Sequence, residues 1–224
     1  MTAHPIAILG GTGPQGRGLA LRFARAGVPV VIGSRDGAKA EETARALRAG
    51  SDLPVIGAAN PVAAAAGDVV FIAVPWAAHE ATLRSLTNEL AGRIVVDLVN
   101  PLEFDKQGPK GLHVPEGSAA QQAQALLPSC RVVSGFHHIS AKLLLDESTG
   151  VDTDILVCGD DLDAKQRVLD LAALIPGARA LDAGPLRLAG WLEGLTAVLL
   201  SINRRYHTSA GIHLTRIDGT HPQI

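Results

Sequence analysis

The sequence predicts an α/β fold in which helices cover both faces of a doubly wound parallel sheet. Short apolar runs alternate with helix-length segments along the 224 residues, a pattern typical of parallel strands joined by helices. Residues 69–74 are apolar at successive positions, as strands are when helices bury both faces of a sheet. A glycine-rich stretch separates the first apolar run from the first helical segment, where such folds make their first tight turn.

The chain opens with two strand, turn and helix units. Residues 6–9 are apolar, and the helical pattern that follows the glycines continues until Gly27 stops it. Residues 28–32 form the second apolar run, and an Ala-, Glu- and Arg-rich helical segment at 38–49 ends at Gly50. Each unit is expected to add one strand and one covering helix.

The alternation continues through the rest of the chain. Apolar runs predict strands and periodic segments predict helices, with strands at 54–57, 68–74, 93–99, 131–136 and 154–157 and helices at 61–66, 77–90, 118–127, 162–175 and 188–206. Several prolines and glycines make residues 100–117 a predicted loop near the strand ends. We expect two domains, residues 1–138 and a smaller, mainly helical C-terminal domain at 139–224.

Composition and charge exclude several classes of protein. The chain has 20 Lys and Arg against 22 Asp and Glu, and only 3% aromatic residues. It lacks the basic surface and the stacking aromatics of a nucleic-acid-binding protein. Cys130 and Cys158 lie far apart in the sequence, so neither a disulfide nor a metal site is predicted. The sequence shows no targeting segment or transmembrane run, which predicts a cytoplasmic protein without a membrane partner.

The first glycines have the Gly-x-Gly-x-x-Gly spacing of a Rossmann-type nucleotide site. Gly11, Gly13 and Gly16 stand between the first strand and the first helix. Glycines there permit a tight turn and let backbone amides approach a pyrophosphate at the positive end of the helix. The spacing alone is a weak signal, but the strand before it and the helix after it supply the required context. A turn that binds nothing is the alternative.

The end of the second strand favours NADP(H) over NAD(H). An NAD-specific site places Asp or Glu there, about 20 residues beyond the glycine turn, whereas this chain has Ser34 and Arg35. A guanidinium binds a 2′-phosphate that a carboxylate would repel, and a hydroxyl adds another donor. Lys39, one helical turn further on, is a second candidate cation. The alternative is that Arg35 and Lys39 are solvated and that Asp36 accepts hydrogen bonds from the ribose.

Three further strand ends supply candidate contacts, because ligands bind outside the carboxyl ends of strands in doubly wound sheets. The residues at these ends are Val74, Pro75 and Trp76, then Asn100, and then His137 and His138. Trp76 is expected to form a wall of a ring pocket, with a buried core aromatic as the alternative. His137 is the histidine expected to contact a ligand, with a hydrogen-bonded structural residue as the alternative.

No catalytic side chain and no metal ligand are predicted. The single tyrosine, Tyr206, is followed four positions later by Ala210 rather than lysine, which excludes the short-chain dehydrogenase mechanism. The histidines and cysteines have no zinc spacing, and no Gly-x-Ser-x-Gly motif is present. We therefore expect cofactors to supply the chemistry while the protein holds two rings face to face and excludes water.

Together these residues resemble the NADPH-dependent reductases of coenzyme F420, the deazaflavin coenzyme:NADP oxidoreductases. The resemblance spans nearly the whole chain. It is carried by Gly10-Gly11-Thr12-Gly13, Gly16-x-Gly18-Leu19-Ala20, Gly33-Ser34-Arg35, Val74-Pro75-Trp76, Gly117-Ser118-Ala119-Ala120, His137, Cys158-Gly159-Asp160-Asp161 and Glu193-x-Leu195-Thr196.

The resemblance implies reversible hydride transfer between C4 of nicotinamide and C5 of the deazaflavin, with no side chain as obligatory acid or base. It also implies a homodimer, and it places the deazaflavin near His137 and the loop after Asn100, against the C-terminal helices. The nucleotide phosphates are then held by Thr12, Gly13, Pro14 and Gln15, and the 2′-phosphate by Ser34, Arg35 and Lys39.

One segment departs from the family pattern and leaves two alternatives open. After residue 186 similar proteins carry Arg-Asn and further polar residues, whereas this chain has Arg187 and then apolar residues up to Trp191. The first alternative is an NADPH-dependent imine or carbonyl reductase, with His137 or His138 as the proton donor. The second is a non-catalytic NADP(H) sensor.

Overall fold

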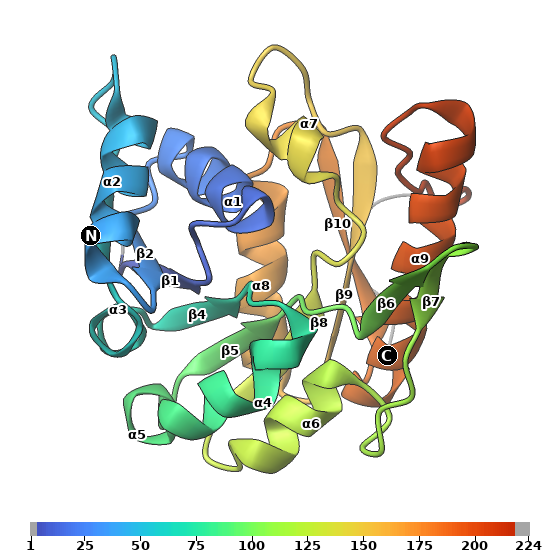
Figure 1. The fold of residues 1–224 in the computed structure, drawn as a ribbon, viewed down its shortest axis with the longest axis horizontal. Coiled ribbons are helices and arrows are strands. Elements are labelled where there is room, and N and C mark those ends of the chain that lie inside the picture. Colours follow the sequence, from blue (N-terminus) through green and yellow to red (C-terminus); the bar gives the residue numbers. More distant parts are fainter. Residues whose placement is uncertain (1–3, 218–224) are drawn as a thin grey trace.

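The computed structural model describes residues 4–217, which form an eight-stranded sheet with helices on both faces and a separate two-stranded hairpin (Figure 1). The order across the sheet is β10-β9-β8-β5-β4-β1-β2-β3. The strands are β1 (Ile6–Leu9), β2 (Val30–Ser34), β3 (Val55–Ala59), β4 (Val69–Ile72), β5 (Ile94–Asp97), β8 (Arg131–Gly135), β9 (Thr153–Gly159) and β10 (Ala178–Gly184).

The sheet is doubly wound about β1. This strand pairs in parallel with β2 on one side and with β4 on the other, so the chain fills the sheet outward in both directions. The six neighbouring strands β3, β2, β1, β4, β5 and β8 are all parallel, which brings their carboxyl ends to one edge. Only β9 and β10 run the other way, because β9 pairs antiparallel with β8 and β10 pairs parallel with β9. The predicted fold class is therefore confirmed.

Helices bury each face of the sheet in its own hydrophobic cluster. One cluster is covered by α1 (Pro14–Arg25), α2 (Gly37–Arg48), α7 (Ala141–Leu145) and α8 (Leu162–Ala173). The other is covered by α3 (Asn60–Ala66), α4 (Trp76–Ser85), α5 (Thr87–Leu90), α6 (Ala119–Leu126) and the 3-10 turn η1 (Leu186–Leu188). Because helices cover both faces of the sheet, side chains on both sides of each strand are buried, which explains the successive apolar residues.

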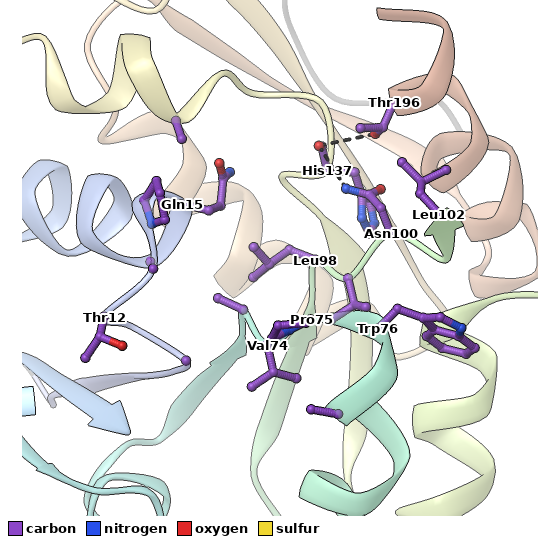
Figure 2. Close-up of a pocket in the computed structure, with 18 of the residues that line it drawn as sticks. Thr12, Gln15, Val74, Pro75, Trp76, Leu98, Asn100, Leu102, His137 and Thr196 are labelled. Carbon is purple, nitrogen blue, oxygen red and sulfur yellow. Dashed lines mark hydrogen bonds between the residues drawn. The ribbon is translucent and has the colours of Figure 1, made fainter. Parts of the chain in front are cut away.

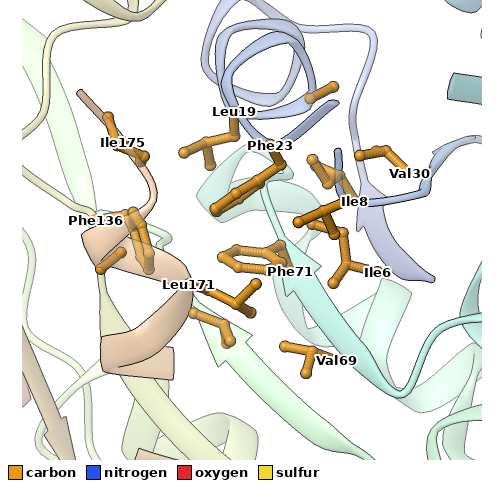
Figure 3. Close-up of a cluster of buried hydrophobic side chains, with 14 of the residues drawn as sticks. Ile6, Ile8, Leu19, Phe23, Val30, Val69, Phe71, Phe136, Leu171 and Ile175 are labelled. Atoms are coloured by element: carbon orange, nitrogen blue, oxygen red, sulfur yellow. The ribbon is translucent and has the colours of Figure 1, made fainter. Parts of the chain in front are cut away.

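Three phenylalanines form the centre of the first cluster (Figure 3). The Phe71 ring lies 5.3 Å from that of Phe23 and 5.4 Å from that of Phe136, in tilted and edge-to-face geometries. Phe136 has a φ of 64°, so the chain turns sharply as it leaves β8. Burial of three large rings there fixes the carboxyl ends of β4 and β8 against α1.

The last part of the chain holds more strand than the sequence predicts. Residues 139–224 were expected to be mainly helical, but they contribute β9 and β10 to the main sheet beside α8 and the long α9 (Ala189–Tyr206). The edge strand β10 was not predicted, because Arg179 and Asp182 interrupt its apolar residues and every position is only half-buried. The division into two domains near residue 138 stays a prediction.

Smaller differences concern the connections. The predicted loop at 100–117 contains a hairpin of β6 (Leu102–Asp105) and β7 (Gly108–Gly111), which lies beside α9 (Figure 1). The single helix expected at 77–90 is divided into α4 and α5, with the break at Leu86. No helix within residues 4–217 is long and apolar enough to cross a membrane.

Candidate functional site

A cavity of about 990 Å³ runs along the carboxyl edge of the parallel strands. It extends from the end of β2, past the glycine turn after β1, to the ends of β5 and β8 and the inner side of α9. Of the residues predicted to bind coenzymes, all except Gly11 line it. Those that line it are Thr12, Gly13, Pro14, Gln15, Gly16, Ser34, Arg35, Lys39, Val74, Pro75, Trp76, Asn100 and His137.

The three glycines of the motif differ in what their backbones approach. A Cβ on Gly16 would lie 2.5 Å from Gly11 Cα, and one on Gly11 would lie 2.7 Å from the Ile8 carbonyl oxygen. These two glycines let the turn fold onto itself, and Gly11 lies behind the cavity wall rather than in it. A Cβ on Gly13 would meet only the Gly10 carbonyl oxygen, at 3.5 Å, so Gly13 faces the open cavity.

Helix α1 presents an uncapped N-terminus to the cavity. Gly13 is the N-cap and makes no side-chain capping bond, and Pro14 occupies the first turn. Gln15 turns sideways and donates a hydrogen bond from Nε2 to the Phe136 carbonyl oxygen at 3.3 Å, which joins α1 to the end of β8. Backbone N–H groups at such a helix end, with the positive end of the helix dipole, bind phosphate groups.

The β2 end of the cavity carries two cations. Arg35 and Lys39 line the cavity and take part in no ion pair within residues 4–217. Asp36 is occupied by helix capping, since its Oδ1 accepts hydrogen bonds from the backbone N–H groups of Ala38 at 2.9 Å and Lys39 at 3.3 Å. The carboxylate that is the alternative ribose acceptor therefore caps α2 through Oδ1, and it lines the cavity beside the two cations.

The middle of the cavity is mostly apolar. Figure 2 shows Thr12 and Gln15 at one end, Asn100, Leu102 and Thr196 at the other, and Val74, Pro75 and Leu98 between them. The Trp76 indole points away from Val74 and stacks on the His79 ring at a centroid distance of 5.4 Å. Trp76 thus lies at the margin of the cavity, partly packed against the core.

His137 faces the cavity through its backbone as well as its ring. Its carbonyl oxygen accepts hydrogen bonds from Thr196 Oγ1 at 3.2 Å and Asn100 Nδ2 at 3.4 Å (Figure 2). The ring is 5% exposed, and its Nε2 lies 2.8 Å from Ser134 Oγ. Burial lowers the pKa of His137 to about 4, so the imidazole is neutral at neutral pH.

His138 is also buried and is held by the backbone. Its Nε2 lies 2.6 Å from the Asp154 carbonyl oxygen, and burial lowers its pKa. Neither adjacent histidine carries a proton that it can readily donate at neutral pH. The imine or carbonyl reductase mechanism, which needs such a donor, loses its candidate groups at this point.

Helix α9 supplies a wall that the sequence did not predict residue by residue. Glu193 is buried, and its carboxylate accepts hydrogen bonds from the N–H groups of Ala119 at 2.9 Å and Ala120 at 3.2 Å, at the start of α6. Burial raises the pKa of Glu193 to about 7. The contact seats α9 beside the cavity, which its residues Thr196, Leu199, Leu200 and Asn203 then line.

Residues 139–142 line the cavity on the side of α1, and a buried guanidinium holds the segment that follows them. Arg22 donates to the carbonyl oxygens of Leu144 at 2.9 Å, Leu143 at 2.8 Å and Thr149 at 3.0 Å. Sequence patterns gave no signal for this part of the wall, because it depends on contacts between residues more than 100 positions apart. Within residues 4–217 no cluster of His, Cys, Asp and Glu is arranged to hold a metal ion.

Known proteins match the chain along nearly its whole length. Residues 5–101 match the family model described as NADP oxidoreductase coenzyme F420-dependent. The F420-dependent NADP reductase of Methanocaldococcus jannaschii is 40% identical over 221 residues, which is 95% of this chain and 99% of that protein. The reductase of Methanothermobacter thermautotrophicus is 40% identical over 220 residues, 95% of each chain.

A solved structure agrees with this relationship. The crystal structure of a putative F420-dependent NADP reductase from Arthrobacter sp. FB24 superposes with a TM-score of 0.82 at 28% identity, covering 96% of this chain and all of that one. The identity to the two methanogen proteins, over almost the full length of both partners, settles the family. The chain belongs to the F420-dependent NADP reductases.

Proposed function

We propose that the protein transfers a hydride reversibly between NADP(H) and the deazaflavin coenzyme F420, and that it does so in the cytoplasm. The observation that carries the proposal is the 40% identity to F420-dependent NADP reductases over nearly the entire chain. The extent and lining of the cavity support two coenzymes placed end to end. Its β2 end carries cations, its centre is apolar, and it continues past β5 and β8 to α9.

The nucleotide half is assigned from its phosphate-binding groups. The N–H groups at the start of α1 bind the pyrophosphate, with Thr12 and Gln15 beside them. Arg35 and Lys39 bind the 2′-phosphate together with the Ser34 hydroxyl. The Asp36 carboxylate also lines the cavity there, but its Oδ1 is held by the N-terminus of α2. This arrangement favours NADP(H) over NAD(H).

The reacting rings bind between Val74, Leu98 and the α9 wall. The two coenzymes supply the hydride chemistry, through C4 of nicotinamide and C5 of the deazaflavin. The protein binds and orients them and replaces water with apolar side chains, which favours a short, dry path between the two carbons. Burial lowers the pKa of both His137 and His138, so neither places an imidazolium beside the rings at neutral pH.

A second copy of the chain covers the outer face of α9 in the proposed assembly. Leu188, Trp191, Val198 and Tyr206 are 37%, 79%, 54% and 75% exposed, and Ile202 is half-buried between the last two. With the half-buried Leu195 between Trp191 and Val198, these residues follow one another at three- and four-residue spacing along one side of the helix. A continuous apolar stripe of this length is typical of a homodimer contact. Residues 187–191, which depart from the family pattern, then belong to the dimer contact.

A spectroscopic assay tests the proposal. The purified protein is mixed with NADPH and oxidised F420, and the visible absorbance of F420 is followed, with NADH and free flavin in parallel. We expect rapid loss of absorbance with NADPH and F420 and little with NADH. Tight NADPH binding without any loss of F420 absorbance would contradict the proposal and favour the sensor.

A further inference from the structure

A buried polar cluster lies beneath the cavity, and the function proposed above does not yet give it a role. It consists of His79 on α4, Asp97 at the end of β5, and Gln122 on α6. The side chains of His79 and Asp97 are both 0% exposed, and His79 Nε2 lies 2.6 Å from Asp97 Oδ2. A charged or strongly polar group this deep is costly unless it is fully paired. None of the three lines the cavity.

The hydrogen-bond pattern fixes the protonation of His79. Gln122 Nε2 donates to the exposed Glu116 carboxylate at 3.3 Å, and since a carboxylate only accepts, the amide oxygen of Gln122 must point the other way. That oxygen lies 3.0 Å from His79 Nδ1. Both ring nitrogens of His79 therefore face acceptors, Gln122 Oε1 and the Asp97 carboxylate. With Asp97 ionised, only the imidazolium, which carries two N–H groups, satisfies both.

The surrounding charges agree with this assignment. Burial by itself lowers the pKa of His79, but the hydrogen bond and charge of Asp97, the hydrogen bond of Gln122 and the charge of Glu193 on α9 outweigh it and leave the pKa raised. On its own helix His79 stacks against the Trp76 indole, with the rings inclined by 28°. An aromatic face next to an imidazolium adds a cation–π attraction.

Two of the three side chains that contact His79, Trp76 and Asp97, belong to adjacent cavity segments. Trp76 ends the turn after β4, which carries Val74 into the cavity, and Asp97 begins the turn after β5. The second oxygen of Asp97 accepts a hydrogen bond from the Val99 N–H at 3.0 Å and so shapes that turn. The His79 ring thus joins the Trp76 indole, at the turn after β4, to the Asp97 carboxylate, which fixes the turn after β5.

We propose that His79 is a buried imidazolium and that it acts as a positioning residue, holding the turns after β4 and β5 in the relative placement that aligns the two coenzyme rings. The kinetic part of this inference rests on the proposed function, but the charge of His79 does not. Small displacements of the ring-binding turns reduce hydride transfer much more than binding.

The charge is tested in the wild-type chain by NMR. Protein labelled with 15N-histidine is examined by long-range 1H–15N correlation, which distinguishes the imidazolium from either neutral tautomer, and the His79 signals are identified by their loss in His79→Gln. At pH 7.5 we expect both nitrogens of His79 to be protonated. One unprotonated nitrogen would overturn the inference, whether or not the protein turns over F420.

Positioning is tested by the separation of kcat from KM. In His79→Gln we expect kcat to fall about tenfold or more, while the KM for NADPH stays within about twofold. Glu80→Gln is the matched control, because Glu80 is the next residue of α4 and is exposed. It should leave both constants within about twofold of wild type. Equal turnover by wild type and folded His79→Gln would overturn the inference without affecting the proposed function.

A milder variant covers the case in which His79→Gln does not fold. Gln122→Met keeps the length of the side chain and removes the acceptor of Nδ1, while the Asp97 pair remains. We expect its NMR spectrum at pH 7.5 to show His79 with less imidazolium than wild type and its kcat to fall severalfold. Unchanged protonation and unchanged kcat would contradict the link. A wild-type chain that fails to reduce F420 would instead refute the proposed function.

Discussion

Thr196 donates a hydrogen bond from Oγ1 to the backbone carbonyl oxygen of His137, at 3.2 Å. The bond joins the inner side of α9 to the carboxyl end of β8, and Asn100 donates to the same oxygen. The wall of the cavity opposite the glycine turn is therefore fixed by groups from three distant parts of the chain. The last helix, rather than the nucleotide motif, therefore completes the end of the cavity that we propose binds the second coenzyme.

The 2′-phosphate assignment predicts a selective loss of affinity. Arg35→Ala should weaken NADPH binding by about 1.5 to 3 kcal/mol, the free energy of a charge-assisted hydrogen bond, and should leave NADH binding nearly unchanged. Titration calorimetry with both nucleotides measures the difference. Arg45→Ala is the control, since Arg45 is an exposed cation of α2, the helix that follows Arg35, and does not line the cavity. Equal weakening of NADPH and NADH would refute the assignment.

The glycine turn predicts two different outcomes for two alanine substitutions. Gly13→Ala has room for its Cβ in the folded chain, so the protein should fold normally but bind NADPH at least tenfold more weakly, because the methyl group stands where the pyrophosphate approaches. Gly16→Ala forces a contact of 2.5 Å with Gly11 Cα and should lower the unfolding temperature. Thermal denaturation and nucleotide titration of both variants separate the two effects. A Gly13→Ala protein with wild-type affinity would contradict this role.

Burial of the His137 ring predicts an acid sensitivity. Its pKa is about 4 in the folded chain and about 6.5 in an unfolded one. The unfolded state therefore binds this proton first, so the stabilisation present above pH 6.5 is lost as pH falls towards 4. The full difference is roughly 3 kcal/mol. Between pH 7.5 and 4.5 the unfolding free energy of wild type should fall more steeply than that of His137→Gln, as measured by urea denaturation. Parallel curves would show that the ring titrates normally.

The apolar stripe on α9 predicts the effect of a buried charge at the dimer contact. Val198→Glu should shift the protein from dimer to monomer in analytical ultracentrifugation at micromolar concentration. Leu162→Glu, on α8, introduces the same charge at a residue that is 59% exposed and lies outside the stripe, and it should leave the dimer intact. Wild type that sediments as a monomer would contradict the proposed contact.

The sequence anticipated the parts of the molecule that depend on local pattern. Apolar runs and glycines between them predict β1, β2, β3, β4, β5, β8 and β9. Ligands bind outside the carboxyl ends of parallel strands, which share one edge, and this rule brings Ser34, Val74, Asn100 and His137 together. The hairpin of β6 and β7 escaped prediction because Pro109 and the glycines around it are typical of loops.

Features that depend on tertiary packing could not be predicted in the same way. Thr196 and Asn203 enter the site only because Glu193 docks α9 on the start of α6, and helical periodicity alone does not say which face meets which partner. Gly11 is the converse case, and its contact with the nucleotide stays a prediction. Motif spacing suggested contact with the nucleotide, but the residue lies behind the cavity wall, where close backbone packing requires a glycine.

The most direct test of hydride exchange between the two coenzymes follows the hydrogen itself. The protein is incubated in ordinary water with oxidised F420 and NADPH that carries deuterium in both C4 positions, and the reduced coenzyme is analysed by mass spectrometry. Direct transfer predicts one deuterium in each molecule of reduced F420. Reduced F420 without deuterium, or no reduction at all while NADPH is bound, would contradict it.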